Sequence, residues 1–281
     1  MSPSEGRRTA GARPRNPGPG PTGSQVTLAR MREFGIRPDR DLGQHFLVDD
    51  NVLDVAGRLL PLSPDDVVLE VGAGLGVLTA WLARRVALVH AVEVDRRLEP
   101  ALTATLVGAG NVRVVWADAA RLDPAELDPR PGVLMANLPY NVATPVIIRA
   151  LPTAERFCVM VQREIADRLF ASPGTKAYGA VSVLVQLACE RLGRRPVSRK
   201  VFAPEPNVDS ALVAFRRRPG VELDDWEWTS RVVHGAFGHR RKTLANALAL
   251  AELPAPPAEI AGLRAEQLPP ERLALLAREL R

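Results

Sequence analysis

Short apolar runs alternate with helix-like stretches through the first two thirds of the chain. Valine-rich apolar runs are typical of strands buried on both faces, whereas apolar positions three and four residues apart are typical of helices. The pattern predicts strands at residues 67–71, 88–93, 112–115, 133–136 and 157–161, and helices at residues 75–85 and 98–107. Strands that alternate with helices predict an α/β fold, with a parallel sheet covered on both faces.

The pattern changes near residue 210. Residues 211–215 predict a late strand, antiparallel at the end of the sheet, and Pro219-Gly220 marks a boundary. Only helical stretches follow, at residues 226–237, 241–250, 257–263 and 270–280. Residues 1–24 are dominated by proline, glycine and arginine, which is typical of a disordered basic tail. We therefore expect a tail (1–24), a sheet domain (25–219) and a small all-helical C-terminal domain (220–281).

The net charge of +5 is unevenly distributed. Residues 1–40 contain eight arginines and three acidic residues, so they account for the whole excess, and the remainder of the chain is neutral overall. Basic residues nevertheless cluster locally, at 191–200, at 216–218, and at Arg240, Arg241 and Lys242. Such clusters are compatible with phosphate binding, although solvated faces often have the same composition.

Several classes of protein are disfavoured by composition. Two cysteines, Cys158 and Cys189, both in apolar runs, exclude a disulfide framework and a cysteine-based metal site, and we expect no metal. We expect no membrane-spanning segment, because no stretch of about 18 uncharged apolar residues occurs. The N-terminus has no apolar segment typical of a secretory signal, so we expect a cytoplasmic protein.

A glycine-rich turn and two acids at strand ends predict a nucleotide site. Residues 70–76 close the first strand with the spacing G-x-G-x-G, in which glycines let the backbone approach a ligand closely. A dinucleotide fingerprint needs glycine where Val77 stands, which weakens the interpretation as a nucleotide-dependent oxidoreductase. Glu93 is placed to accept hydrogen bonds from ribose hydroxyls, and Asp118 from an exocyclic amine such as adenine N6.

The candidate chemical centre is Asn137-Leu138-Pro139-Tyr140, which follows the fourth strand. The side-chain oxygen of Asn137 and the carbonyl of Leu138 can accept both hydrogens of an adenine amine, which directs the nitrogen lone pair toward an electrophile. Pro139 fixes the turn that aims the carbonyl. Tyr140 offers a face on which an extruded base can stack. The tetrapeptide therefore predicts methylation of an exocyclic amine.

From residue 41 to residue 272 the chain resembles the KsgA group of ribosomal RNA adenine dimethyltransferases, which is related to the Erm resistance methyltransferases. The segments that carry this resemblance are residues 42–49, the Gly72 loop, Glu93, Asp118, and residues 137–141, 176–179, 201–211, 240–243 and 264–266. The blocks at 176–179, 240–242 and 264–266 resemble the KsgA group in particular.

The resemblance implies a Rossmann-like methyltransferase sheet with S-adenosylmethionine (SAM) as methyl donor. It implies that His45 and Leu47 flank the methionine part of SAM, above the Gly72 loop. His45 stands where the family usually has asparagine, so a side-chain amide contact there would be lost and a backbone contact kept. The resemblance also implies that Glu93 binds the ribose of SAM and that Asp118 binds its adenine amine. It implies further that Asn137 lies between the cofactor and the target base. Phe202 would face the target base opposite Tyr140.

The implied reaction is dimethylation of N6 of two adjacent adenosines near the 3′ end of 16S rRNA, during biogenesis of the small ribosomal subunit. We expect a monomer acting on an immature 30S particle, with Arg240, Arg241 and Lys242 among the residues that bind RNA phosphates. Two alternatives stay open: an Erm-like methyltransferase of 23S rRNA, and a non-catalytic RNA-binding assembly factor. A DNA adenine methyltransferase is disfavoured because Leu138 replaces the usual first proline of the motif.

Overall fold

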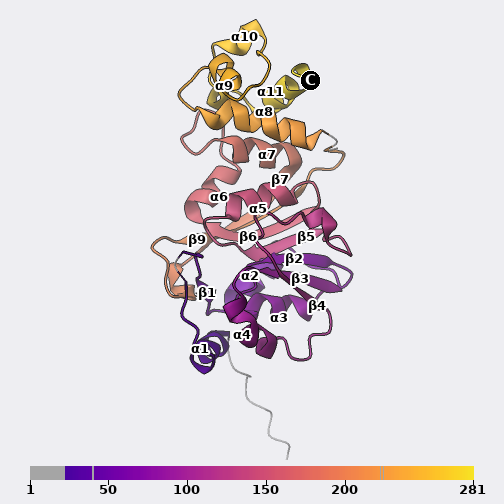
Figure 1. Cartoon of the computed structure of the whole chain (residues 1–281), viewed down its shortest axis with the longest axis vertical. Coiled ribbons are helices and arrows are strands. Elements are labelled where there is room, and N and C mark those ends of the chain that lie inside the picture. The colour runs from indigo at the N-terminus through magenta and orange to yellow at the C-terminus, as the bar shows by residue number, and fades with distance from the viewer. Residues whose placement is uncertain (1–22, 40, 222, 224) are drawn as a thin grey trace, which may run out of the picture.

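The structure is a computed structural model that describes residues 23–39, 41–221, 223 and 225–281. The predicted basic tail, residues 1–24, lies outside the described residues except for its last two, which begin helix α1 (Gly23–Glu33). The described chain forms an elongated stack, with α1 at one end, the sheet in the middle and the C-terminal helices at the other end (Figure 1).

A seven-stranded sheet with the order β4-β3-β2-β5-β6-β9-β7 forms the centre of the described chain. Strands β4, β3, β2, β5 and β6 pair in parallel, and β9 and β7 continue the sheet in antiparallel pairings. Its strands are β2 (Val67–Val71), β3 (Leu88–Glu93), β4 (Val112–Trp116), β5 (Val133–Asn137), β6 (Arg156–Gln162), β7 (Cys189–Val197) and β9 (Ser210–Arg217). The five predicted parallel strands are thereby confirmed within a residue or two at each end.

Helices cover both faces of the sheet, as the alternating pattern predicted. The helices are α2 (Asn51–Leu59), α3 (Val77–Ala83), α4 (Glu99–Thr105), α5 (Ala143–Ala150), α6 (Arg163–Leu169), α7 (Ala180–Ala188), α8 (Trp226–Gly238), α9 (Leu244–Leu250), α10 (Ala258–Ala261) and α11 (Pro270–Glu279). Four short 3₁₀ turns in the described chain are η1 (Arg96–Leu98), η2 (Pro124–Glu126), η3 (Arg199–Val201) and η4 (Ala265–Gln267).

Neighbouring strand residues point to opposite apolar layers. Val68 of β2 and Met135 of β5 pack with α2 and α3, whereas Leu69 and Leu134 pack with α5, α6 and α7. This alternation follows from the period of two along a strand, and burial on both faces explains why the central strands are almost wholly apolar. Each strand is therefore held from two sides, which fixes the positions of the residues at its carboxyl end.

The C-terminal helices extend one of these two layers. Val232 of α8 and Leu273 of α11 belong to the same buried cluster as Leu134 of β5, so the apolar core runs without a break across the expected boundary at residue 219. Tyr178, before α7, is fully buried, and its hydroxyl donates to the carbonyl of Leu268 at 2.8 Å. This contact ties the sheet to the C-terminal helices.

Two features of the sheet differ from the sequence prediction. The expected late strand, β9, is antiparallel as predicted but lies one place in from the edge, because β7 pairs along its outer side. Strand β7 is basic and has no alternation of apolar residues, since as an edge strand it is largely exposed. A separate two-stranded ladder joins β1 (Phe46–Leu47) to β8 (Phe202–Ala203), pairing Leu47 with Phe202.

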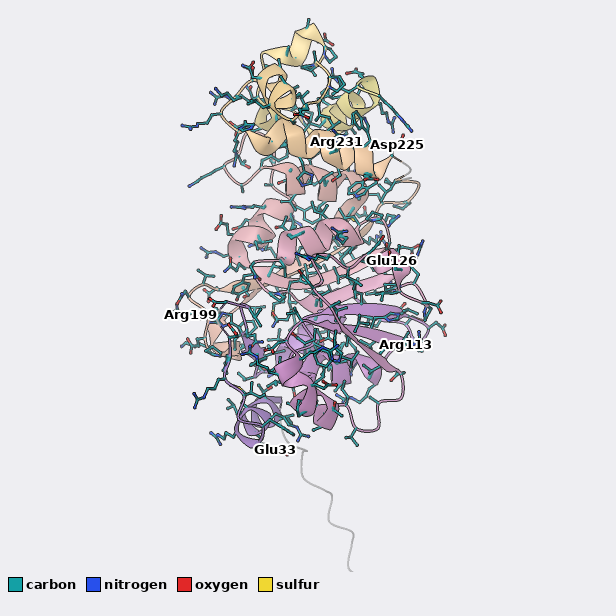
Figure 2. The ribbon with its side chains drawn as sticks, in the orientation of Figure 1. Glu33, Arg113, Glu126, Arg199, Asp225 and Arg231 are labelled. Carbon is teal, nitrogen blue, oxygen red and sulfur yellow. The ribbon has the colours of Figure 1, made fainter. Side chains whose placement is uncertain are left out.

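No helix in the described part of the chain is long and apolar enough to cross a membrane. Charged side chains instead cover the outside of the molecule along its whole length (Figure 2).

Candidate active site

A cavity of about 280 Å³ opens where the parallel strands end. Its lining includes every residue for which the sequence predicted a catalytic or cofactor-binding role: His45, Leu47, Gly72, Glu93, Asp118, Asn137, Leu138, Pro139 and Tyr140. These residues come from the ends of β2, β3 and β5, the turn after β4, and strand β1. The carboxyl edge of an open α/β sheet is where such folds bind ligands, so the site lies where the topology predicts.

The glycine-rich turn lets the backbone line the cavity directly. Gly72, Gly74 and Gly76 have φ values of +80°, +56° and +82°, a conformation that other residues rarely adopt. A Cβ atom on Gly72 would lie 3.3 Å from Pro139, and one on Gly74 would lie 3.3 Å from the ring of Phe46. The turn is thus packed between the Asn137–Tyr140 tetrapeptide and strand β1, and glycine is needed for both conformation and space.

The carboxylate of Glu93 is almost fully buried and organises the turns around it. Its Oε2 accepts from the N–H of Gly74 at 2.8 Å, and its Oε1 accepts from the N–H groups of Val94 and Asp95 at 2.9 Å each. A carboxylate has about four acceptor sites, so one remains, and it is on Oε2. Glu93 therefore combines a structural role with capacity for a ligand hydroxyl.

Asp118 lies at the rim of the cavity. Its side chain is 47% exposed and forms an ion pair with Arg121 at 3.6 Å, while its Oδ1 accepts from the N–H of Ala120 at 2.9 Å. Because Arg121 is itself largely exposed, this ion pair is weak and leaves the carboxylate able to accept from a ligand.

Asn137 is oriented by the segment that crosses the cavity. Its side-chain Nδ2 donates to the carbonyl of His45 at 3.3 Å, so the amide oxygen is left to accept. The N–H of Leu138 donates to the carbonyl of Met160 on the neighbouring strand at 3.0 Å, which fixes the peptide that follows Asn137. The contact to His45 runs through the backbone carbonyl, and the imidazole Nδ1 lies 2.8 Å from the carbonyl oxygen of Pro204.

Tyr140 has a polar anchor that the sequence analysis did not foresee. Its hydroxyl lies 3.0 Å from the Oγ of Ser210, a fully buried residue at the start of β9, and burial raises the pKa of the tyrosine. The tyrosine ring centre lies 5.5 Å from that of His45. Ser210 lies in the block at residues 201–211, but no spacing rule connects it with Tyr140, which follows β5.

Glu70 is a second residue whose importance the sequence did not reveal. It lines the cavity at the end of β2, and its side chain is 1% exposed. Its Oε2 has no hydrogen-bond partner among the described residues. Burial, together with the nearby charge of Glu93, raises the pKa of Glu70 to about 8. A buried acid with a strongly raised pKa beside a cavity is typical of functional sites.

The four predicted RNA-facing residues lie outside this cavity. Phe202 is 3% exposed and packs with Leu47 in the apolar layer of α2 and α3. Arg240 forms an ion pair with Glu266 at 2.9 Å, between α8 and η4, whereas Arg241 and Lys242 are exposed. The predicted stacking face of Phe202 and the predicted phosphate contacts of residues 240–242 therefore stay predictions.

The basic clusters are distributed over the molecule and partly engaged in internal contacts. Figure 2 shows Arg199, of the cluster at residues 191–200, beside the sheet, and Arg231 of α8 among the C-terminal helices, so basic residues lie on separate parts of the surface. Arg194 pairs with Asp167 at 2.6 Å and Arg216 with Glu190 at 2.6 Å. Fewer cations than the sequence count suggested are consequently available to an external anion.

Among the described residues, no group of three or more histidine, cysteine, aspartate or glutamate side chains is arranged to hold a metal ion. Both cysteines are buried, and burial raises the pKa of each thiol to about 12, so neither is a reactive thiolate near neutral pH.

Comparison with known proteins gives one consistent result. A family model described as "Ribosomal RNA adenine dimethylase" matches residues 37–255. "Ribosomal RNA small subunit methyltransferase A" of Rubrobacter xylanophilus is 44% identical over 258 residues, covering 87% of this chain and 95% of that protein. The protein of the same name from Thermobifida fusca is 47% identical over 225 residues, covering 77% of this chain and 78% of that protein.

Solved structures share the fold. The 23S rRNA methyltransferase ErmE is 28% identical with a TM-score of 0.59, covering 84% of this chain and 99% of that structure. A dimethyladenosine transferase from Plasmodium falciparum has a TM-score of 0.67 at 23% identity, covering 84% of this chain and 97% of that structure. Both support a Rossmann-like methyltransferase sheet followed by C-terminal helices.

Proposed function

Because this chain belongs to the ribosomal RNA adenine dimethylase family, we propose that it dimethylates N6 of two adjacent adenosines near the 3′ end of 16S rRNA, with SAM as methyl donor. The observation that carries this proposal is the cavity itself, in which the whole predicted cofactor set meets the Asn137–Tyr140 tetrapeptide. The names of the relatives, which refer to the small ribosomal subunit, favour 16S rRNA over 23S rRNA as the substrate.

The residues around the cavity fit SAM by charge. The described lining contains three acidic residues, Glu70, Glu93 and Asp118, and no lysine or arginine. Because the pKa of Glu70 is raised to about 8, the negative charge near neutral pH belongs mainly to Glu93 and Asp118. SAM carries a sulfonium, an ammonium and a carboxylate, hence a net positive charge, and a cavity lined by acids attracts such a ligand. The free acceptor site on Glu93 suits a ribose hydroxyl, and the exposed carboxylate of Asp118 suits the adenine amine.

When bound, SAM supplies a methyl group on a sulfonium, an electrophile that a nitrogen lone pair can attack. The chain's own contribution is to hold that nitrogen. The amide oxygen of Asn137 and the carbonyl of Leu138 accept the two N6 hydrogens, which keeps the lone pair out of the ring's delocalisation. The ring of Tyr140 holds the extruded base by stacking, worth ~1–3 kcal/mol. The methylated nitrogen then loses its proton to water, so no strong base is required.

We propose an immature 30S particle as the partner, met in the cytoplasm by a monomer of this chain. The exposed cations Arg241 and Lys242 support a contact with RNA phosphates, and Arg240 holds the α8–α9 connection through Glu266. The two residues just before the 176–179 segment contact the other two segments that resemble the KsgA group: Gly174 donates to the carbonyl of Glu266 at 2.7 Å, and Arg240 donates to that of Thr175 at 3.3 Å. This surface suits recognition of folded RNA by shape.

The experiment is transfer of tritium from labelled SAM to 30S particles, 50S particles and duplex DNA, followed by nucleoside analysis. Label recovered as N6,N6-dimethyladenosine in 16S rRNA is the expected result. Label confined to 23S rRNA would show an Erm-like specificity, and absence of label from every substrate would favour a non-catalytic binding protein. The Asn137→Ala variant is the control for residual methylation by contaminating enzymes.

A further inference from the structure

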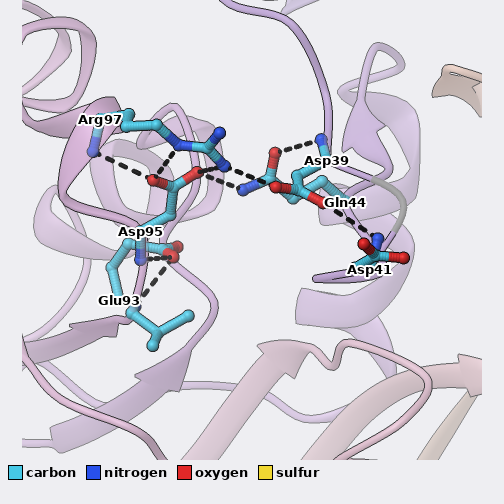
Figure 3. A network of polar contacts seen from close by, with 7 residues as sticks. Asp39, Asp41, Gln44, Glu93, Asp95 and Arg97 are labelled. Carbon is cyan, nitrogen blue, oxygen red and sulfur yellow. Dashed lines mark hydrogen bonds and ion pairs between the residues drawn. The ribbon is translucent and has the colours of Figure 1, made fainter.

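The segment that carries His45 and Leu47 is fastened to the cofactor cavity on two sides. On one side, β1 pairs with β8. On the other, a group of four side chains joins the segment to the turn after β3 (Figure 3). We call this group the polar latch; its members are Asp39, Gln44, Asp95 and Arg97. No catalytic or binding role was predicted for any of them from the sequence.

Asp95 is the centre of the latch. Its carboxylate is 7% exposed and accepts from three groups of Arg97: the backbone N–H at 3.0 Å, Nε at 2.7 Å and Nη2 at 2.8 Å. The same carboxylate accepts from the side-chain Nε2 of Gln44 at 2.8 Å. Four hydrogen bonds therefore converge on one nearly buried acid, and one of them comes from the segment that crosses the cavity.

Asp39 closes the latch into a ring. Its Oδ2 accepts from Nη2 of Arg97 at 2.8 Å, and its backbone N–H donates to Oε1 of Gln44 at 2.8 Å. Arg97 lowers the pKa of both Asp39 and Asp95, so both acids are charged near neutral pH. Because Arg97 is 62% exposed, its isolated ion pairs would be weak, and it is the convergence of bonds that gives the latch its geometry.

Two members of the latch, Asp95 and Gln44, connect it to residues of the proposed cofactor site. The N–H of Asp95 donates to Oε1 of Glu93 at 2.9 Å, so one hydrogen bond from the backbone connects the latch to the acid proposed to bind the ribose. Gln44 directly precedes His45, whose carbonyl orients the amide of Asn137. Opening the latch would therefore free one side of the cavity wall formed by residues 44–47, which would then be held only by the pairing of β1 with β8.

We propose that the polar latch holds residues 44–47 closed over the cofactor cavity, and that its four members are positioning residues for SAM binding. This inference rests on the proposed function, because it assumes that the cavity takes SAM. If binding requires the closed segment, the apparent dissociation constant equals the intrinsic constant divided by the closed fraction. A change that reduces the closed fraction to about one tenth should weaken SAM binding about tenfold.

The test is calorimetric titration of SAM into the full chain carrying Gln44→Glu, which places a carboxylate against Asp95. The dissociation constant should rise about tenfold, with kcat at saturating SAM within about twofold of the wild type, because the tetrapeptide is untouched. Gln44→Ala is the milder variant, which removes both side-chain hydrogen bonds of Gln44 without adding a charge. Asp41→Asn is the matched control: it removes one charge from the same exposed segment, and Asp41 contributes only its backbone N–H to Asp39.

A compensating variant distinguishes positioning from simple damage to the fold. In Gln44→Glu combined with Asp95→Asn, the donor and the acceptor of the bond between residues 44 and 95 are exchanged and the repulsion between two carboxylates is removed. One bond from Nη2 of Arg97 to residue 95 is lost, so SAM affinity should recover in part, at least threefold over Gln44→Glu alone. Unchanged SAM affinity in folded Gln44→Glu and Gln44→Ala proteins would overturn the inference, as would an equal loss in Asp41→Asn. If the wild-type chain binds no SAM, the proposed function fails along with the inference. If the wild-type chain binds SAM and the Gln44 variants bind it equally well, the inference alone fails.

Discussion

Replacing Glu70 with glutamine should stabilise the protein at alkaline pH. Glu70 is buried at the end of β2, one of its carboxylate oxygens lacks a partner among the described residues, and burial raises its pKa to about 8. Thr79 lies beside the carboxyl and partly offsets this rise. Glutamine has nearly the same shape but no charge to desolvate, so the substitution isolates the cost of ionisation.

The sign of the effect follows from proton linkage. A carboxyl whose pKa is raised in the folded state binds its proton more tightly there than in the unfolded chain. Its contribution to stability is fully present below the ordinary pKa of 4.5 and is lost as the pH rises toward about 8. Since one pKa unit is worth about 1.4 kcal/mol, the wild type should lose on the order of 4 kcal/mol across this range through Glu70 alone.

Urea unfolding at pH 5 and at pH 8.5 measures this loss. Glu70→Gln should match the wild type within about 1 kcal/mol at pH 5, and exceed it by roughly 3–4 kcal/mol at pH 8.5. Asp65→Asn, an exposed acid just before β2, is the control and should leave the difference between the two pH values unchanged. The same pH dependence in Glu70→Gln and in the wild type would refute the reasoning, since it would mean that Glu70 is ionised at little cost.

Four further predictions concern the site and the RNA-facing cations. Glu93→Gln should lower SAM affinity in calorimetry by ~1.5–3 kcal/mol and lower the melting temperature. The reason is that the amide has one oxygen in place of two, and its NH₂ group cannot accept the hydrogen bond that the N–H of Gly74 donates to Glu93. Asn137→Ala should reduce kcat about 10²–10³-fold in tritium transfer, with little change in RNA binding. Tyr140→Phe should lose only the bond to Ser210, about 1 kcal/mol, and keep most activity, whereas Tyr140→Ala should weaken base capture, as KM for 30S particles will show. Neutralising Arg241 and Lys242 should reduce the salt dependence of RNA binding by roughly one unit of slope per lost phosphate contact, measured by filter binding.

The sequence predicted the parts of the fold whose pattern is dictated by burial. Four of the parallel strands, β2, β3, β5 and β6, are buried on both faces, so each appears as an apolar run, whereas the edge strand β4 is partly exposed but still rich in valine. The candidate residues follow at strand ends, where topology brings them together. Strand β7 could not be predicted this way, because an exposed edge strand such as Arg191–Arg195 satisfies its backbone through β9 and needs no apolar alternation. The ladder of β1 with β8 is too short to show any periodicity.

The residues of the site that the sequence did not predict were missed for a similar physical reason. Local spacing identified Glu93 and Asn137 because each belongs to a motif, but it gave no indication of Ser210 or Gln44, which act on partners distant in the sequence. The raised pKa of Glu70 depends on complete burial by several elements and is invisible in a linear motif. Spacing also could not show that Phe202 packs into the apolar layer rather than along the cavity.

The ladder between β1 and β8 determines when in synthesis the protein can become a methyltransferase. Strands β2 to β6 can pair as soon as they leave the ribosome, because the long-range pairings among them involve only earlier segments. The segment with His45 and Leu47, although made first, acquires its partner only after residue 203 emerges. Closing so long a loop is slow relative to forming local contacts. A nascent chain that ends before β8 should therefore contain most of the sheet and yet have no finished binding wall.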